Sequence, residues 1–212
     1  MPVATLIQQF KTSDVFWQQF EVAEKLTKSH DQSVLEQLEP YLKDVDRHVR
    51  GNAAFVFAAS RDDRGFEVIA RILKDRSDRP EGQGMPGGNW SVQAQIANDR
   101  YYAAHLFGDL KDSRAVPILI PLLHDPEVNS IIPWSLGNIG DKSAVPYLIQ
   151  TPDDANPDMR VLAIYALEAL KARDALPRLR LLTNDKDRIH FDRAGTVAES
   201  AKKAVIKLEA LH

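Results

Sequence analysis

The chain has 212 residues, of which 44% are apolar and 27% are charged, and its formal net charge is −3. That charge balance argues against a nucleic-acid-binding domain, because such domains carry a broad basic excess. The absence of cysteine excludes disulfides, thiolate catalysis and cysteine-ligated metals. The N-terminus lacks the pattern of a signal peptide and no long apolar run is present, so we expect a cytoplasmic protein without a membrane-spanning segment.

A unit with a period of about 30 residues recurs along the chain. It contains two small residues, often Ala-Ala, and it ends in Asp; the copies lie at 49–62, 99–112, 128–141 and 159–174. Three copies are followed by Ala-Val-Pro or Ala-Leu-Pro and then by Leu- and Ile-rich text, at 115–117, 144–146 and 175–177. Two short helices per unit at this period are typical of an α-solenoid.

Apolar periodicity predicts the helices in chain order. They cover 15–26, 34–42, 47–60, 65–74, 95–110, 114–123, 127–139, 143–150, 157–171 and 174–183, and a closing helix lies near 196–211. The aspartates Asp112, Asp141 and Asp174 are placed to cap the helices whose first turn contains proline. Pro133 falls inside a predicted helix, where we expect it to cause a kink.

Two insertions, at about 77–91 and 186–193, interrupt the same kind of turn between a proline-type helix and an Ala-Ala helix. Equivalent turns of a solenoid lie on one edge, where repeat proteins often place a binding surface. The candidate contacts there are Met85, Trp90, His190 and Phe191. We expect Trp90 to dock on a flanking helix pair while 82–88 stays mobile.

The text at 115–125 and 136–141 resembles the short HEAT repeat of the phycobilisome-lyase subtype, and the match covers roughly 14–211 outside the two insertions. The resemblance implies an all-α fold: a right-handed α-solenoid of about five HEAT-like helix pairs plus a C-terminal capping helix, in one domain over 1–212. It also implies that the Ala-Ala helices line the concave face. The family includes scaffolds, bilin lyases, a metal-dependent hydroxylase and DNA glycosylases.

The same resemblance implies a ladder of hydrogen bonds between repeats. It assigns this structural role to Arg50, Arg100 and Arg160, with Asp75 or Asp125 as their partners. The ladder is expected to be interrupted in the fourth unit, where Asn129 replaces the Arg. We therefore expect Arg100 and Arg160 to be buried, with their guanidinium groups bonded to backbone carbonyls or to an Asp of a neighbouring turn.

One position of the repeat, which the template leaves free, carries a ring in four successive units. Helical spacing places polar and aromatic side chains around these rings. The resulting candidate binding residues are Phe55, Tyr101, His105, Asp109, Trp134, Asn138, Tyr165 and Glu168. Two interpretations remain open: the rings pack into the core between repeats, or they form an aromatic groove for a peptide or a flat ligand.

The sequence contains no strong catalytic signal. No His-Glu pair, helical zinc motif or phosphate-binding loop is present, and the His105–Asp109 pair, although capable of acid–base chemistry, is of a kind usually found as a surface contact. We expect no catalytic residue, metal or cofactor, and a monomeric scaffold that binds a protein or peptide on its concave face. The alternatives are a bilin lyase-like or chaperone-like factor that handles a flat chromophore and, disfavoured by the charge, a HEAT-like DNA glycosylase.

Overall fold

The computed structural model describes residues 1–29, 31–77, 91–151, 154–191 and 195–211, so the predictions for Met85 and Trp90 lie outside the described residues. Over these ranges the chain is helical, without a strand, and one isolated bridge joins Arg188 to Thr196. The described part contains no helix long and apolar enough to cross a membrane. The chain divides into two compact units, Met1–Leu106 and Phe107–His212, and its organisation as one domain stays a prediction.

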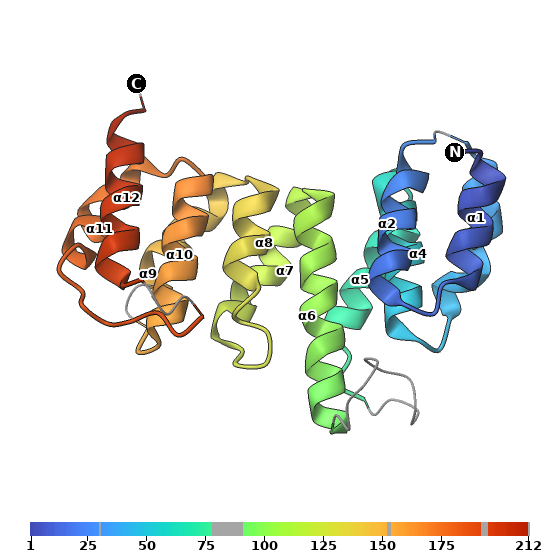
Figure 1. Cartoon of the computed structure of the whole chain (residues 1–212), viewed down its shortest axis with the longest axis horizontal. Helices are drawn as coiled ribbons and strands as arrows, with labels where there is room; N and C mark the ends of the chain where they lie inside the picture. Colours follow the sequence, from blue (N-terminus) through green and yellow to red (C-terminus); the bar gives the residue numbers. More distant parts are fainter. Residues whose placement is uncertain (30, 78–90, 152–153, 192–194, 212) are drawn as a thin grey trace. The chain divides into compact units, whose positions relative to one another are not determined.

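Unit 1 is built from helices that pack around α4 (Figure 1). It contains α1 (Val3–Thr12), α2 (Phe16–Thr27), α3 (Ser33–Leu38), the 3-10 helix η1 (Glu39–Lys43), α4 (Arg47–Ala59), α5 (Asp63–Lys74) and the part of α6 (Val92–Leu110) up to residue 106. Helix α1 was not predicted. It buries Leu6, Ile7 and Phe10 and packs against α2 and α3.

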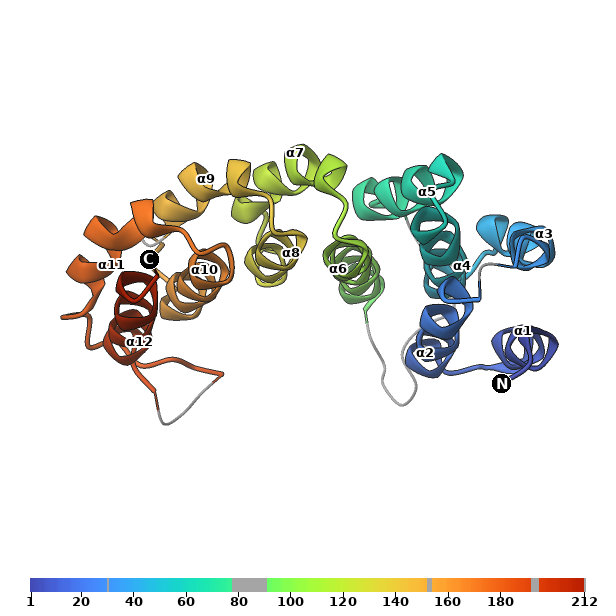
Figure 2. The same ribbon diagram turned by 90° about the horizontal axis from the view of Figure 1, so that it is seen from above.

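Unit 2 has two layers of helices (Figure 2). One layer contains α7 (Val116–Leu119), α9 (Val145–Gln150) and α11 (Leu176–Leu182), each preceded by a 3-10 turn: η2 (Ser113–Ala115), η4 (Lys142–Ala144) and η6 (Arg173–Ala175). A further 3-10 helix, η3 (Ile120–His124), continues α7. The other layer contains α8 (Ile132–Ile139), α10 (Pro157–Ala169) and α12 (Val197–Glu209). Alternating layers of short helices confirm the predicted α-solenoid fold class.

Three local predictions are wrong. Pro133 lies in the first turn of α8, where its missing N–H costs nothing, so it does not kink a helix interior. The segment before it forms turns, which makes α8 shorter than the predicted 127–139. Asp112 and Asp141 cap their helices as predicted, but the helix near Asp174 begins after Ala172 and Asp174 lies in its first turn.

The prediction that Arg100 and Arg160 are buried and bonded is confirmed. Arg100 donates its Nε–H to the carbonyl of Leu73 over 2.9 Å. Arg160 donates to the carbonyl of Asp154 over 2.8 Å and forms ion pairs with Asp185, at 2.9 Å, and with Asp187, at 2.5 Å. Arg160 thereby ties the start of α10 to the beginning of the second insertion.

Unit 1 departs from the ladder that the resemblance implied. Asp75 pairs with Arg47 over 2.8 Å rather than with Arg50, and the buried Asp99 pairs with the other end of the same guanidinium over 3.1 Å. Arg50 is half-buried and donates to the carbonyl of Asp44 over 2.6 Å. Arg47 lies one helical turn before Arg50, so it shares a face of α4 with it and reaches the carboxylates first.

We expect Arg160→Ala to lower the free energy of unfolding by about 2–4 kcal/mol, because it leaves Asp185 and two backbone carbonyls without their donor. Urea unfolding followed by circular dichroism measures the loss. The matched control is Arg180→Ala, which removes an exposed pair with Glu209 and should cost less than about 1 kcal/mol. Equal losses in the two variants would show that Arg160 has no special structural role.

Candidate binding surface

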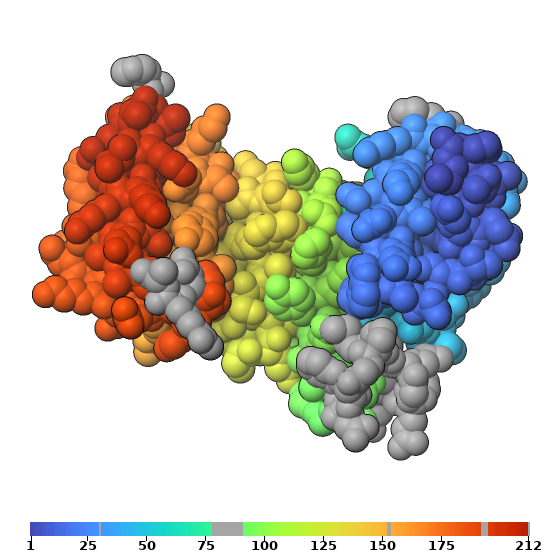
Figure 3. Space-filling view, viewed as in Figure 1, coloured from blue at the N-terminus to red at the C-terminus, as the bar shows by residue number. Residues whose placement is uncertain are grey.

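In unit 2, the free position of the repeat template lies on the layer formed by α8, α10 and α12. It holds Trp134 on α8, Tyr165 on α10 and Lys203 on α12. Trp134 is 38% exposed and Tyr165 is 46% exposed, so both rings reach solvent. Figure 3 looks onto this layer and shows the side chains of α8 in yellow, α10 in orange and α12 in red as one continuous surface of the unit. Two adjacent helices of this layer thus each carry a large exposed ring at the same repeat position.

The Trp134 ring is seated against backbone. A Cβ atom added at Gly108 would lie 2.6 Å from Trp134 Cζ3 and 3.1 Å from the Cα of Ser135, so only glycine fits there without a shift. Asn138, one turn after Trp134, donates its side-chain amide to the carbonyl of Gly108 over 3.2 Å. One edge of the ring is therefore held by the protein while the rest stays accessible.

A pocket of about 320 Å³ lies between α10 and α12. Tyr165 and Glu168 line it from α10, and Ser200, Lys203 and Lys207 line it from α12. Lys207 forms an ion pair with Glu168 at the pocket wall. The pocket thus combines one ring, one paired carboxylate and a second ammonium group, that of Lys203.

The second insertion returns to the start of α10. The backbone N–H of His190 donates to Asp158 over 2.6 Å, and the His190 ring nitrogen Nδ1 lies 3.2 Å from the same carboxylate. Ile189 is buried, whereas Phe191 is 56% exposed. His190 is therefore held against the start of α10 and Phe191 is exposed, and their role as contacts for a partner stays a prediction.

In unit 1, the corresponding positions have a different environment. Phe55 is only 6% exposed and packs edge-to-face on Phe20 of α2, with ring centroids 5.0 Å apart. His105 is half-buried, 6.4 Å from the Phe20 ring and 6.4 Å from the Tyr102 ring. For Phe55 the groove interpretation is wrong and the core interpretation holds, because Phe20 of α2 covers its ring.

A buried polar cluster beside these rings was not anticipated from the sequence. Arg47 bridges Asp75 and Asp99, and His48 stacks on Phe16 with ring centroids 4.4 Å apart. The amide of Asn98 lies 3.1 Å from His48 Nε2. Burial and mutual pairing make this cluster a structural element of unit 1 rather than an open site.

A second polar network in unit 1 links α2 to α4 and α6. Asn52 donates to Gln19 over 2.9 Å and accepts from the Tyr102 hydroxyl over 2.5 Å, and Gln19 donates to the carbonyl of Phe10 over 3.0 Å. The sequence offers one indication of this network: Gln19 and Asn52 are polar residues on faces of predicted helices that otherwise carry apolar residues.

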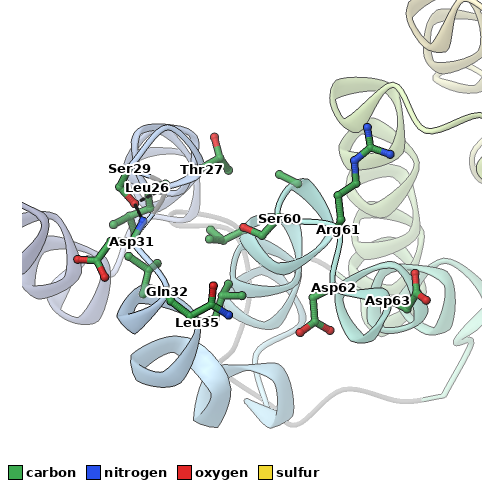
Figure 4. Close-up of a pocket in the computed structure, with 13 residues that line it drawn as sticks. Leu26, Thr27, Ser29, Asp31, Gln32, Leu35, Ser60, Arg61, Asp62 and Asp63 are labelled. Atoms are coloured by element: carbon green, nitrogen blue, oxygen red, sulfur yellow. Dashed lines mark hydrogen bonds between the residues drawn. The ribbon is translucent and has the colours of Figure 1, made fainter.

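Another pocket, of about 610 Å³, opens between the α2–α3 turn and the α4–α5 turn (Figure 4). Its carboxylates already have structural roles. Asp31 accepts from the backbone N–H of Ser33 over 2.9 Å, and Asp62 caps α5 and holds Arg64. Hydrogen bonds from these partners keep the pKa of Asp31 and of Asp62 below the ordinary value. Arg61 and Asp63 add one charge of each sign to the lining.

The remaining predicted binding residues differ in their exposure and lie in different units. Tyr101 is 38% exposed in unit 1, and burial of its ring edge raises the pKa of its hydroxyl. Asp109, Asn138 and Glu168 are half-buried in unit 2. The structure thus brings Trp134, Asn138, Tyr165 and Glu168 onto one layer of unit 2, with Lys203 as an addition to the predicted set.

Comparison with known proteins addresses the fold. No family model matches the chain, and no curated protein matches its sequence. The chain is similar to the complex of CpcE and CpcF of phycocyanin lyase from Nostoc sp. PCC7120, with a TM-score of 0.56 and 24% identity over 85% of this chain and 67% of that chain. It is similar to an engineered protein at a TM-score of 0.50 and 19% identity, over 97% of both chains. A designed armadillo repeat protein matches at a TM-score of 0.48 and 17% identity, over 98% of this chain and 100% of that chain.

The chain has a HEAT/armadillo-like repeat fold. This confirms the repeat type predicted from the sequence. Arg100 and Arg160 are buried and bonded within this fold. They are therefore not available to contact the phosphate groups of DNA, as a DNA glycosylase would require.

The pKa of Asp75 makes the stability of unit 1 dependent on pH. Burial raises this pKa, but hydrogen bonds from Ser77 and the charge of Arg47 outweigh burial, so the pKa lies below its ordinary value. The stabilisation is complete above the unfolded pKa of about 3.9 and is lost as the pH falls through the lower folded value. We expect Asp75→Asn to unfold at lower urea concentration than the parent chain at pH 7, with a difference that shrinks below about pH 4.

The exposed substitution Glu24→Gln controls for the loss of one negative charge. A difference between Asp75→Asn and the parent chain that is the same at pH 7 and at pH 3 would contradict the assignment of Arg47 and Ser77 as partners of an ionised Asp75.

Proposed function

We propose that the chain is a non-enzymatic scaffold that binds a segment of a protein or peptide on the α8, α10 and α12 layer of unit 2. The observation that carries this proposal is the pair of exposed rings, Trp134 and Tyr165, at the same repeat position on adjacent helices. Tryptophan and tyrosine are enriched among the residues that dominate binding energy at protein interfaces.

The arrangement of the layer supports a polypeptide ligand. Trp134 is held against Gly108, so it presents a ring of restricted mobility, and little ordering entropy is lost when a partner covers it. The pocket beside Tyr165, about 320 Å³, has the size to receive one side chain of a partner. Glu168 and Lys203 provide polar groups of both signs at its rim, which would fix the register of a bound segment.

The test compares removal of the two rings of the candidate layer with removal of one similarly exposed ring on the other layer. Tyr165 is 46% exposed on the candidate layer, and Tyr147 on α9 is 47% exposed on the opposite layer. We expect the double variant Trp134→Ala/Tyr165→Ala to lose at least tenfold of its partner in pull-downs from host lysate, while Tyr147→Ala keeps it. Thermal unfolding of each variant measures whether the fold is retained.

A photo-crosslinking amino acid at position 165, compared with position 147, identifies which face touches the partner. Polypeptide adducts at position 165 alone agree with the proposal. Equal capture by all variants, or collapse of the melting temperature in Trp134→Ala, would mean that the rings are not a binding surface.

A second candidate function is handling of a flat chromophore, as by a bilin lyase-like or chaperone-like factor. The likeness to the structure of a phycocyanin lyase complex favours it, and two neighbouring exposed rings also suit a flat conjugated ligand. Titration of the purified chain with a free bilin should then shift the absorption band of the bilin, and Trp134→Ala should abolish the shift. An unchanged spectrum at saturating protein would rule out this candidate.

A further inference from the structure

A second groove, unrelated to the proposed binding layer, lies in unit 1 between η1 and α5. Its volume is about 540 Å³, which is within the range of small-molecule sites. The side chains of Leu42 from η1 and Val68 from α5 line it, and both residues are buried. The groove therefore has an apolar floor.

The walls of the groove carry more positive than negative charge. The cationic lining residues are Lys43, Arg50, Arg64 and Arg71, and the acidic ones are Glu39, Glu67 and Asp75. Two of the three carboxylates are engaged in ion pairs: Glu39 with Arg64 over 2.7 Å, and Asp75 with Arg47, which lies outside the lining, over 2.8 Å. The lining that remains has three cations, Lys43, Arg50 and Arg71, against the single carboxylate of Glu67.

Arg50 is the central cation of this groove. It is half-buried, and the hydrogen bond that the structure records for its guanidinium goes to the neutral carbonyl of Asp44 over 2.6 Å. Within the described part of the chain, no carboxylate forms an ion pair with it. Burial, and next the charge of Arg47, lower the pKa of Arg50, while the charges of Asp75, Asp99 and Asp44 act in the opposite direction, and an arginine stays protonated at neutral pH. Arg50 therefore has carboxylates nearby but none in an ion pair with it, and a bound anion would give its guanidinium a direct charged partner.

We propose that the groove between η1 and α5 binds a small organic monocarboxylate, with its carboxylate on Arg50 and its apolar body on Leu42 and Val68. A guanidinium fork matches the two oxygens of a carboxylate. A bare phosphate fits less well because it would leave the apolar floor of Leu42 and Val68 uncovered. Lys43 and Arg71, at the exposed rim, attract the ligand without forming its central contact.

The experiment titrates the full-length chain with three probes and follows backbone amide shifts by NMR. The probes are N-acetyl-L-leucine, its neutral analogue N-acetyl-L-leucinamide, and inorganic phosphate. We expect saturable shifts at Arg50 and Val68 with the acid, at least tenfold weaker binding of the amide, and weaker binding of phosphate. Binding of the acid should also weaken as salt concentration rises.

Two sets of variants separate binding from folding. Arg50→Gln should reduce affinity for the acid at least tenfold, but it also removes the bond to Asp44 and so can affect the fold. Lys43→Gln/Arg71→Gln changes exposed positions only and should weaken binding severalfold without changing the melting temperature. Arg180→Gln, exposed in unit 2, is the control and should bind as the parent chain does.

The proposal is overturned if the acid and the amide bind equally, or if no saturable shift occurs with N-acetyl-L-leucine. It is also overturned if Lys43→Gln/Arg71→Gln and Arg50→Gln, folded as judged by their spectra, bind the acid as tightly as the parent chain. Tighter binding of phosphate than of the acid would replace the monocarboxylate with a phosphate ligand.

Discussion

Close approach between neighbouring helices is the constraint on which the rest of this structure depends. A Cβ atom added at Gly65 would lie 2.3 Å from the carbonyl oxygen of Ala54, and one added at Gly137 would lie 3.1 Å from the Cα of Ala166. At Gly65, α4 and α5 therefore approach with no room for a side chain, and at Gly137 the same holds for α8 and α10. Because small residues hold the helix backbones close together, larger side chains on the other faces of the same helices either fill the core or reach the surface.

The buried charges of unit 1 show a second consequence of that packing. Arg47 has one guanidinium for two carboxylates, and Asp99 has no exposed side-chain surface. A buried ion pair adds little net stability, because both charges lose their hydration. Separating the partners is nevertheless costly, because each would remain charged and buried, so the pair holds the helices in one arrangement. The cluster therefore sets the relative positions of α4, α6 and the end of α5. Arg160 has a similar role in unit 2, where its ion pairs hold the beginning of the second insertion next to α10.

The same repeat position has opposite environments in the two units. Phe55 and Tyr165 occupy equivalent places in the repeat template, yet Phe55 is buried by Phe20 and Tyr165 is exposed. The difference arises because the Phe20 ring of α2 covers Phe55, whereas Tyr165 lines an open pocket opposite Lys203 of α12. A binding surface on the α8, α10 and α12 layer is thus proposed from exposure in the folded state, and the periodicity of the rings alone does not establish it.

The sequence by itself determined the helix pairs, most of their boundaries and the HEAT-like repeat, because local signals such as Ala-Val-Pro, the capping Asp residues and the apolar period act within a few residues. The resemblance to the HEAT repeat also implied that Arg100 and Arg160 are buried and bonded, as the structure shows. Only the tertiary structure decided that Arg47 rather than Arg50 pairs with Asp75, and that Phe55 is core while Trp134 and Tyr165 reach solvent. These outcomes depend on which helix lies over a given face, and a one-dimensional period does not contain that information.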